Sequence, residues 1–369
     1  MISGNNSIHG FFITYQRLMM LNKQQFGCNQ PWGDCSDIDI YIDMNSVTKE
    51  LFYNRPPENG GAEVASSILN LCGHYREYYR RYHQCETRFF IIYSINRPSN
   101  CVAIYDEYNS KNIMMQMGKP IIYNMITDAC SYLDSICKYI PDVFFIYSDY
   151  ETSTAIYDII ERRENKSYPS LVISKDPLAY EIIAFSQKAI LARPRKTARS
   201  QQQVNQERLV NTQDHSEFYN HNEILPVLMS EHIKNVYPEW RKISPSLISF
   251  IYALYGVSNR NIPMLLNMKE TLSTISRGIE FGDIANSYEP NISKLYNALN
   301  IAGFGVDERM IYDRFRMIDL ITQQAIMQQD LSLGVDDYAM NVVNLHDPDR
   351  VRYINNTEFK NCPVILENF

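Results

Sequence analysis

The feature that most restricts the fold of this 369-residue chain is the alternation of short strand patterns with longer helical patterns. Runs rich in β-branched and aromatic residues, typical of buried strands, occupy residues 38–43, 89–95, 101–105, 143–147 and 171–174. Apolar residues at helical spacing separate them, most clearly over residues 62–84, 121–139 and 152–163. Strands that alternate with helices form a mostly parallel sheet, so we predict an α/β fold with helices on both faces.

The second half of the chain has a different pattern, in which helices follow one another without strands. We predict helices over residues 222–235, 245–255, 269–279, 292–299 and 307–329. The predicted organisation is an N-terminal extension, an α/β core, a basic and polar connecting segment, a helical portion and a C-terminal tail. These occupy residues 1–36, 37–187, 188–221, 222–332 and 333–369.

Acidic residues follow several of the predicted strands. They are Asp43, Asp106, Glu151 and Asp176. Parallel sheets bind ligands at the carboxyl ends of their strands, so these carboxylates are candidates for one common site. Clustered carboxylates repel one another unless a cation lies among them, and Mg²⁺ prefers such hard oxygen ligands. For each aspartate taken alone, a role as a helix cap or turn residue remains open.

A motif in the helical portion gives the strongest indication of ancestry. Residues 252–264 contain Gly256, Asn261, Ile262 and Pro263 in the register of a Leu-x-Gly-Asp-x-Ser-Asp-Asn-Ile-Pro-Gly pattern. This resembles the 5′-nuclease family, which includes flap endonucleases and the 5′-nuclease domains of phages and bacterial DNA polymerases. The resemblance covers roughly residues 38–280 and implies a PIN-like core followed by a helix–turn–helix variant.

The resemblance also orders the acids. Asp43 resembles the acid after the first strand, and Asp106 in Ala-Ile-Tyr-Asp resembles the aspartate of the family's Phe-Asp-Gly. Glu151 follows Tyr150 as in the family's Tyr-Glu-Ala-Asp-Asp, and Asp176 stands in a Ser-x-Asp element. By this resemblance the four acids are the candidate catalytic and metal-binding residues, at one site for Mg²⁺ or Mn²⁺.

Several positions depart from the family pattern. Ser153, Thr154, Leu178, Val257 and Arg260 stand where the family has acids. Leucine and valine cannot bind magnesium, and a guanidinium would repel it, so a second metal site is expected to be lost. The family's glycine-rich turn, which lets the backbone approach phosphate, is replaced by residues 264–271 without glycine. Apolar residues there favour a protein contact or core packing.

Contact with nucleic acid would need a local basic surface, because the net charge is −7. The candidate residues are Lys111, Arg193, Arg195, Lys196, Arg199 and Lys269. Residues 188–208 are the most basic and least patterned segment, and a solvated linker is the alternative interpretation. Arg76, Arg80 and Arg81 lie among tyrosines on one predicted helix, where an ordinary solvated basic side is the alternative.

The cysteines favour a reducing environment. There are eight, with no Cys-x-x-Cys pair and no signal peptide before them, so we expect a cytoplasmic or virion-associated protein that is not secreted. Cys72, His74, His83 and Cys85 have the composition of a zinc set, but residues two apart on one helix face different ways. No apolar run is long enough to span a bilayer, and we expect no membrane partner.

These observations lead to one functional expectation and two alternatives. The expectation is a degenerate 5′-nuclease-like protein, catalytically impaired, that acts as a nucleic-acid-associated or structural component of a larger assembly with protein partners. One alternative is a metal-dependent nuclease for DNA or RNA with one remaining metal site. The other is a purely architectural subunit, which the 27 tyrosines and the long unmatched ends suit. The Asn-, Ile- and Tyr-rich composition suggests an AT-rich phage or viral genome.

Overall fold

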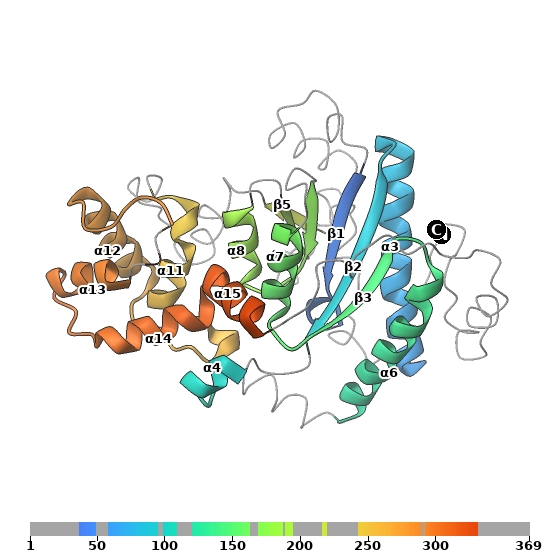
Figure 1. Cartoon of the computed structure of the whole chain (residues 1–369), viewed down its shortest axis with the longest axis horizontal. Coiled ribbons are helices and arrows are strands. Elements are labelled where there is room, and N and C mark those ends of the chain that lie inside the picture. The colour runs from blue at the N-terminus through green and yellow to red at the C-terminus, as the bar shows by residue number, and fades with distance from the viewer. Residues whose placement is uncertain are drawn as a thin grey trace, which may run out of the picture.

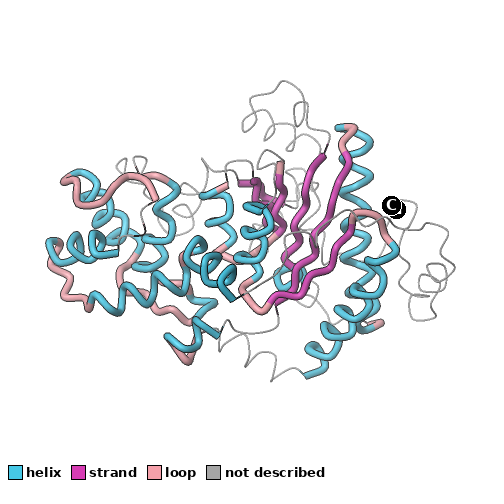
Figure 2. The backbone as a smooth tube through the Cα atoms, viewed as in Figure 1, coloured by secondary structure: helices cyan, strands magenta, loops and turns pink. Residues whose placement is uncertain are grey.

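The protein is described by a computed structural model over residues 37–48, 58–94, 99–108, 120–162, 169–186, 189–194, 216–219, 243–288, 290 and 292–330. Within these residues a twisted sheet stands between two layers of helices, and a group of further helices extends from one of those layers (Figures 1 and 2). The predicted α/β fold with a helical C-terminal portion is confirmed. No helix among these residues is long and apolar enough to cross a membrane.

The sheet has six strands in the order β3-β2-β1-β4-β5-β6. All neighbours are parallel except β6, which runs antiparallel to β5. The strands are β1 (Asp37–Asp43), β2 (Glu86–Ser94), β3 (Val143–Ser148), β4 (Ser170–Ile173), β5 (Ala189–Pro194) and β6 (Ser216–Tyr219). The central strands are buried on both faces, which explains their nearly continuous apolar sequences.

Side chains alternate between the two faces of the sheet, so one strand serves two cores. In β1, Ile38, Ile40 and Ile42 pack toward the layer formed by α3 (Gly60–His83) and α6 (Pro120–Ile136). Tyr41 lies on the other face and stacks on Phe90 of β2, with ring centroids 5.0 Å apart. That second face is covered by α7 (Thr152–Arg162) and α8 (Ala179–Phe185).

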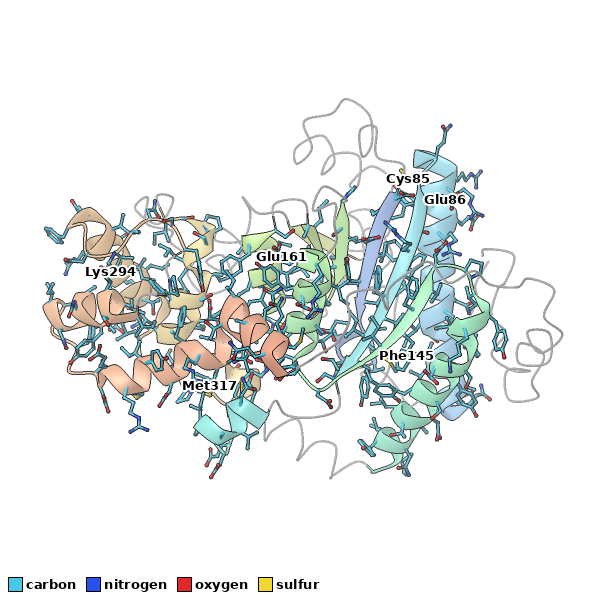
Figure 3. The ribbon with its side chains drawn as sticks, in the orientation of Figure 1. Cys85, Glu86, Phe145, Glu161, Lys294 and Met317 are labelled. Atoms are coloured by element: carbon cyan, nitrogen blue, oxygen red, sulfur yellow. The ribbon has the colours of Figure 1, made fainter. Side chains whose placement is uncertain are left out.

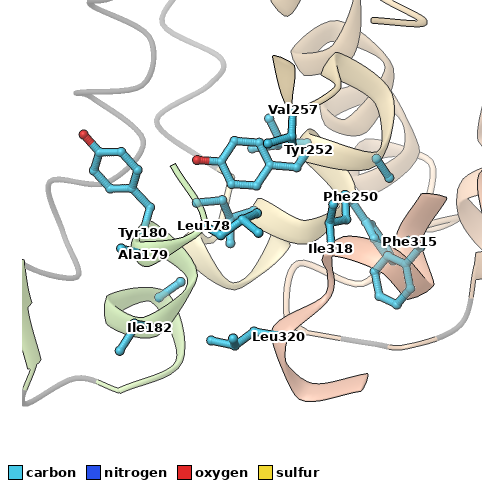
Figure 4. Packing of buried hydrophobic residues seen from close by; sticks show 14 of the residues in the cluster. Leu178, Ala179, Tyr180, Ile182, Phe250, Tyr252, Val257, Phe315, Ile318 and Leu320 are labelled. Atoms are coloured by element: carbon cyan, nitrogen blue, oxygen red, sulfur yellow. The ribbon is translucent and has the colours of Figure 1, made fainter. Parts of the chain in front are cut away.

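The C-terminal helices continue the second core without a break. They are η5 (Pro245–Leu247), α11 (Ile248–Tyr255), η6 (Ser258–Arg260), α12 (Met268–Glu280), α13 (Ile292–Ile301), α14 (Glu308–Ile318) and α15 (Leu320–Asp330). Leu178 and Ile182 of the α8 region belong to the same buried cluster as Phe250, Phe315 and Leu320 (Figure 4). The helical portion is therefore held to the sheet by a shared hydrophobic core.

One strand prediction is wrong. The run at residues 101–105 lies partly in a helix, α4 (Ser99–Ile104), followed by a turn, and Asp106 therefore does not follow a strand. A short apolar run does not distinguish a strand from a buried helical segment, and here tertiary packing decides. The Cys101 thiol lies 3.8 Å from the Met317 carbonyl oxygen and 3.7 Å from Gln323 Oε1, so α4 is packed against α14 and α15.

The predicted single helix over residues 307–329 is also wrong, because it divides at Asp319 into α14 and α15. Thr322 donates to Asp319 Oδ2 from its backbone nitrogen at 2.9 Å and from its hydroxyl at 2.7 Å. These bonds cap the start of α15, and local bonds of this kind compete with a continuous helix. Tyr288 donates to the same oxygen at 2.9 Å.

The basic segment contains structure that its composition did not predict. Ala189–Pro194 and Ser216–Tyr219 form β5 and β6, so this part of the chain contributes two strands to the sheet. The extension at residues 1–36, the predicted helix at residues 222–235 and the tail at residues 333–369 lie outside the described residues. The domain boundaries stay predictions.

A buried carboxyl group fixes the start of α15. Glu181 of α8 is fully buried, and its Oε2 accepts a hydrogen bond from Leu320 N at 2.8 Å. Burial raises the pKa of the Glu181 carboxyl well above its ordinary value, and the nearby charge of Asp319 raises it further. The folded protein therefore disfavours the ionised form of Glu181.

The turn after α11 depends on a glycine. Gly256 has φ +86°, and a Cβ atom there would lie 2.6 Å from the Pro263 carbonyl oxygen. This close approach lets Val257 and Ile262 form a β-bridge around η6. Arg314 of α14 stabilises the same turn, because its guanidinium donates hydrogen bonds to the carbonyl oxygens of Ala253 and Pro263.

We expect Gly256→Ala to lower the free energy of unfolding by about 2–4 kcal/mol, because the methyl group meets backbone atoms and the backbone angle is strained. Gly282→Ala is the matched control, since Gly282 also has positive φ, +78°, but a methyl group added there would meet no atom within 4 Å. The control should cost only about 1 kcal/mol. Urea denaturation of both variants measures the difference, and equal losses would contradict the close-approach argument.

We expect Glu181→Gln to stabilise the protein at neutral pH by about 1–3 kcal/mol. Above the ordinary glutamate pKa the unfolded chain releases the proton of Glu181, while burial raises the pKa of this carboxyl in the folded protein, so stability falls as pH rises. A glutamine stays neutral in both states and removes that loss. Urea denaturation at pH 5.0 and pH 7.5 tests this, and an equal gain at both pH values would contradict it.

Candidate functional site

Three of the four predicted acids meet at the carboxyl edge of the sheet. Asp43 ends β1, Glu151 lies between β3 and α7, and Asp176 follows β4. The charges of Asp176 and Asp43 both act on the Glu151 carboxyl and raise its pKa, so the three groups are electrostatic neighbours. The parallel register of the strands is what brings residues so distant in sequence to one edge.

Asp43 is nearly fully buried and is held by two serine residues. Its Oδ2 accepts from Ser46 Oγ at 2.5 Å and from Ser174 Oγ at 2.6 Å, and its Oδ1 accepts from Ser46 N at 3.2 Å. The bond from Ser46 N is the N-terminal cap of the helical turn that follows β1. Asp43 therefore caps a helix, which was the alternative role left open by the sequence, and it also belongs to the acidic site.

Arg260 occupies the space between the other two acids. Its Nη2 lies 2.6 Å from Glu151 Oε2 and also pairs with Asp176 Oδ2, and its side chain is only 4% exposed. Arg260 comes from η6, in the turn that Gly256 makes possible. A guanidinium from the helical portion therefore neutralises carboxylates from the sheet, at a place where the sequence predicted a divalent cation.

The charges of this group depend on one another. Burial alone would lower the pKa of the Arg260 guanidinium, but the carboxylates of Asp176 and Glu151 outweigh it, and the pKa of Arg260 is raised. Burial raises the pKa of the Glu151 carboxyl, and the adjacent Arg260 opposes that shift. The fully buried Tyr108 lies beside Glu151 and also favours its ionised form. Removal of Arg260 would take away the guanidinium that pairs with both carboxylates.

The arrangement does not fit a divalent metal ion. Among the residues placed in the structure, no group of three or more His, Cys, Asp or Glu side chains could hold a metal. The oxygens of Glu151 and Asp176 that converge are directed at a guanidinium, and the Asp43 carboxylate accepts serine hydroxyl groups. A positive charge at this position would repel Mg²⁺.

Unlike the other three predicted acids, Asp106 does not lie at or just after the end of a strand: it lies in the turn that follows α4, and its side chain is exposed. The residue at the carboxyl end of β2 is Ser94 instead. Its backbone is fixed by Asn45, which donates to Ser94 O at 2.8 Å and accepts from Ser94 N at 3.0 Å. The predicted strand over residues 89–95 corresponds to β2, and Ser94, the next-to-last residue of that predicted run, was the signal that could have identified this position.

The positions where the family pattern has further acids are part of the core. Leu178 and Val257 are buried in the second hydrophobic cluster, and Ser153 and Thr154 are buried in the first turn of α7. Tyr252 donates from its hydroxyl to the Pro177 carbonyl oxygen at 2.8 Å, which joins α11 to the segment that carries Asp176. Packing and hydrogen bonds fill this region of the site.

The predicted nucleic-acid residues are only partly described. Lys111, Arg195, Lys196 and Arg199 lie outside the described residues. Arg193 lies in β5 opposite Glu217 of β6, and Lys269 is exposed in the first turn of α12. Arg76 is not on a solvated basic face, because it is buried and donates to the carbonyl oxygens of Thr87 and Pro141.

The start of α12 is closed by its own side chains. Asn267 Oδ1 accepts from Glu270 N at 2.9 Å, and Glu270 Oε2 accepts from Asn267 N at 3.0 Å, which is a complete capping box. A carboxylate therefore occupies the helix end where the family pattern would let phosphate approach. Leu266 and Met268 are buried while Met264 is exposed, so the apolar residues of this turn serve mainly core packing.

Comparison with solved structures identifies the architecture. The structure of the bacteriophage T5 5′-exonuclease with divalent metal ions (zinc) bound is 12% identical, with a TM-score of 0.50 over 78% of this chain and 92% of that chain. The chain has the 5′-nuclease fold. A complex of the T5 D15 flap endonuclease with DNA and metal ions is 12% identical, with a TM-score of 0.49 over 79% of this chain and 94% of that one.

A third structure extends the same likeness. The eukaryotic junction-resolving enzyme GEN-1 is 9% identical, with a TM-score of 0.42 over 90% of this chain and 70% of that one. Neither the protein-family models nor the curated protein sequences contain a match to this sequence. The likeness to the T5 5′-exonuclease, with its TM-score of 0.50, confirms the predicted 5′-nuclease resemblance at the level of the fold.

We expect Arg260→Gln to lower the free energy of unfolding by about 3–5 kcal/mol, because it removes the guanidinium that pairs with the buried Glu151 and the partly buried Asp176. Mg²⁺ or Mn²⁺ at millimolar concentration should raise the melting temperature of this variant and leave that of the native protein unchanged. Arg309→Ala, which removes an exposed arginine 3.9 Å from Asp313, is the control and should change stability little. A native protein stabilised as strongly by Mg²⁺ would contradict this account.

Proposed function

We propose that this protein is a 5′-nuclease-fold protein whose catalytic site is closed by an internal ion pair, and that it serves as a non-catalytic, nucleic-acid-associated component of a larger assembly. The observation that carries the proposal is Arg260, which pairs with Glu151 and Asp176 at the carboxyl edge of the sheet. Catalysis of phosphodiester cleavage by metal ions needs those carboxylates free to bind a cation.

Two further observations support loss of catalysis. Ser94 stands at the end of β2, where a hydroxyl group is a much weaker magnesium ligand than a carboxylate. Leu178 and Val257 are buried in the core and supply no ligand oxygen from their side chains. Removal of Arg260 could let a cation bind between Glu151 and Asp176, but restoring a catalytic metal site would require several further substitutions.

Association with nucleic acid is supported by the fold and by Lys269, and it is limited by the acidic net charge of −7 and by Glu270 at the start of α12. We expect weak, salt-sensitive binding without base specificity. The phage or viral origin, the virion or cytoplasmic location and the protein partners belong to the same proposal.

A metal-dependent nuclease is the second candidate, because Asp43, Glu151 and Asp176 still converge. In that case movement of Arg260 away from the acids would have to precede metal binding. A purely architectural subunit is the third, and the capping box on α12 favours it because it obstructs the approach of phosphate to that helix.

The test is an assay of the purified protein on single-stranded, duplex and flap substrates of DNA and RNA with Mg²⁺ or Mn²⁺, beside Asp43→Asn. We expect no cleavage above that of the Asp43→Asn protein. Metal-dependent cleavage that Asp43→Asn abolishes would overturn the proposal and establish the second candidate.

Binding is measured separately by fluorescence anisotropy of labelled flap DNA in EDTA at low and moderate salt. We expect Lys269→Glu to weaken binding several-fold, about 1 kcal/mol, through loss of one phosphate contact. Lys138→Glu is the control, since Lys138 follows α6 on the opposite side of the sheet. No binding at low salt would favour the architectural candidate.

A further inference from the structure

The strand β3 forms one edge of the sheet, with β2 as its only neighbour among the described strands. Phe89 N donates to Asp142 O at 2.8 Å, so the backbone groups of Asp142 face β2. Because alternate residues of a strand direct their backbone groups to the same side, the amides and carbonyl groups of Val143, Phe145 and Tyr147 face away from β2. An extended chain could form a new ladder with them.

Within the part of the chain that the structure describes, β3 itself has no proline, charge or bulge to protect it as an edge strand. Its sequence, Val-Phe-Phe-Ile-Tyr-Ser, contains no proline and no charged residue, and it pairs with β2 in regular register over its whole length. An apolar edge of this kind is a template for pairing with another chain, and its persistence in a native protein points to a partner.

An aromatic surface lies beside this edge. Tyr147 is 51% exposed and makes an edge contact with Phe145, with ring centroids 5.0 Å apart (Figure 3). Tyr123 of α6 is 37% exposed, and Ile121 at the start of α6 is 68% exposed. Tyr123 is close enough to Tyr147 to add to the rise in its pKa, which burial mainly causes. Aromatic side chains that are partly exposed next to backbone donors are typical of protein interfaces.

The charge around the edge is acidic. Asp142 precedes β3 and Asp149 follows it. Asp134 lies close enough to Tyr147 for its charge to contribute to the raised pKa of the Tyr147 hydroxyl. Lys138 is the one basic residue between α6 and the end of β3, and it pairs with Asp134 at 3.2 Å. A segment that binds here is therefore favoured if it carries lysine or arginine at its ends.

A second copy of this chain is disfavoured as the occupant. In an antiparallel pair of two β3 strands, the outward-facing Val143, Phe145 and Tyr147 of one copy would stand opposite Tyr147, Phe145 and Val143 of the other. Asp142 and Asp149 of the two copies would then lie one position apart at each end of the pair, and like charges held this close are destabilising. The acidic ends of the edge thus favour a partner of opposite charge.

We propose that the outer edge of β3 binds an extended segment of a partner protein by strand addition, and that this segment has an apolar centre flanked by basic residues. The backbone groups of Val143, Phe145 and Tyr147 supply the ladder. Tyr123 and Tyr147 contact the apolar side chains of the segment, and Asp142 and Asp149 pair with its basic ends. The edge lies beyond β2 from β1 and β4, at whose carboxyl ends Asp43 and Asp176 lie, and Asp149 at its end is two residues from Glu151.

The probe is the synthetic peptide Lys-Val-Thr-Tyr-Thr-Val-Lys with a fluorescent label, added to the full-length protein. Two matched peptides have glutamate in place of both lysines, or N-methylated central amides that cannot form a ladder. We expect the lysine peptide to bind about tenfold more tightly than either of them. Hydrogen exchange of the amides in Val143–Ser148 should slow when it binds.

Tyr147→Lys should weaken binding of the lysine peptide at least several-fold, while Phe281→Lys, which changes a 72% exposed phenylalanine elsewhere, should not. Equal binding of all three peptides would overturn the proposal, since it would indicate adsorption to apolar surface. No binding up to about 1 mM peptide would also overturn it. Self-association of the native protein that Tyr147→Lys abolishes would show that a second copy is the occupant, which the proposal excludes.

Discussion

The buried ion pair of Arg260 with Glu151 and Asp176 is the interaction on which the rest of the structure depends. A guanidinium and two carboxylates in a buried site are stable only when their geometry is fixed, because each would cost several kcal/mol if left alone. The pair also connects two parts of the protein, since Arg260 belongs to the helical portion and both acids belong to the sheet. One interaction therefore sets the position of the helical portion and the electrostatic state of the site.

The rest of the helical portion is built to hold that arginine in place. Gly256 lets the backbone turn tightly enough to present Arg260, and Arg314 fixes the same turn through the carbonyl oxygens of Ala253 and Pro263. Around these polar contacts, the cluster in Figure 4 is continuous from α8 to α14. Apolar burial supplies the free energy, and the polar contacts select one arrangement of the helices.

Asp43, Glu151 and Asp176 bring three acidic groups to the carboxyl edge of the sheet, and their charge must be offset whether or not the protein is an enzyme. In a metal-dependent nuclease, divalent ions bound between substrates and carboxylates offset this charge, and they can exchange with solvent. Here a covalently attached guanidinium neutralises two of the acids, and serine hydroxyl groups hold the third. The same fold is thereby stabilised without a ligand, and surfaces outside this edge become the places to expect contact with other molecules.

The sequence by itself determined the α/β fold, most strands and helices, and the acids that converge, because hydrophobic periodicity and residue types at strand ends are local properties. It did not determine that residues 101–105 form a helix with a following turn, that Ala189–Pro194 joins the sheet or that Asp319 divides a helix. Those outcomes depend on contacts with distant residues. The role of Arg260 was likewise decided by tertiary structure, because only folding brings it within 2.6 Å of Glu151, 109 positions earlier in the chain.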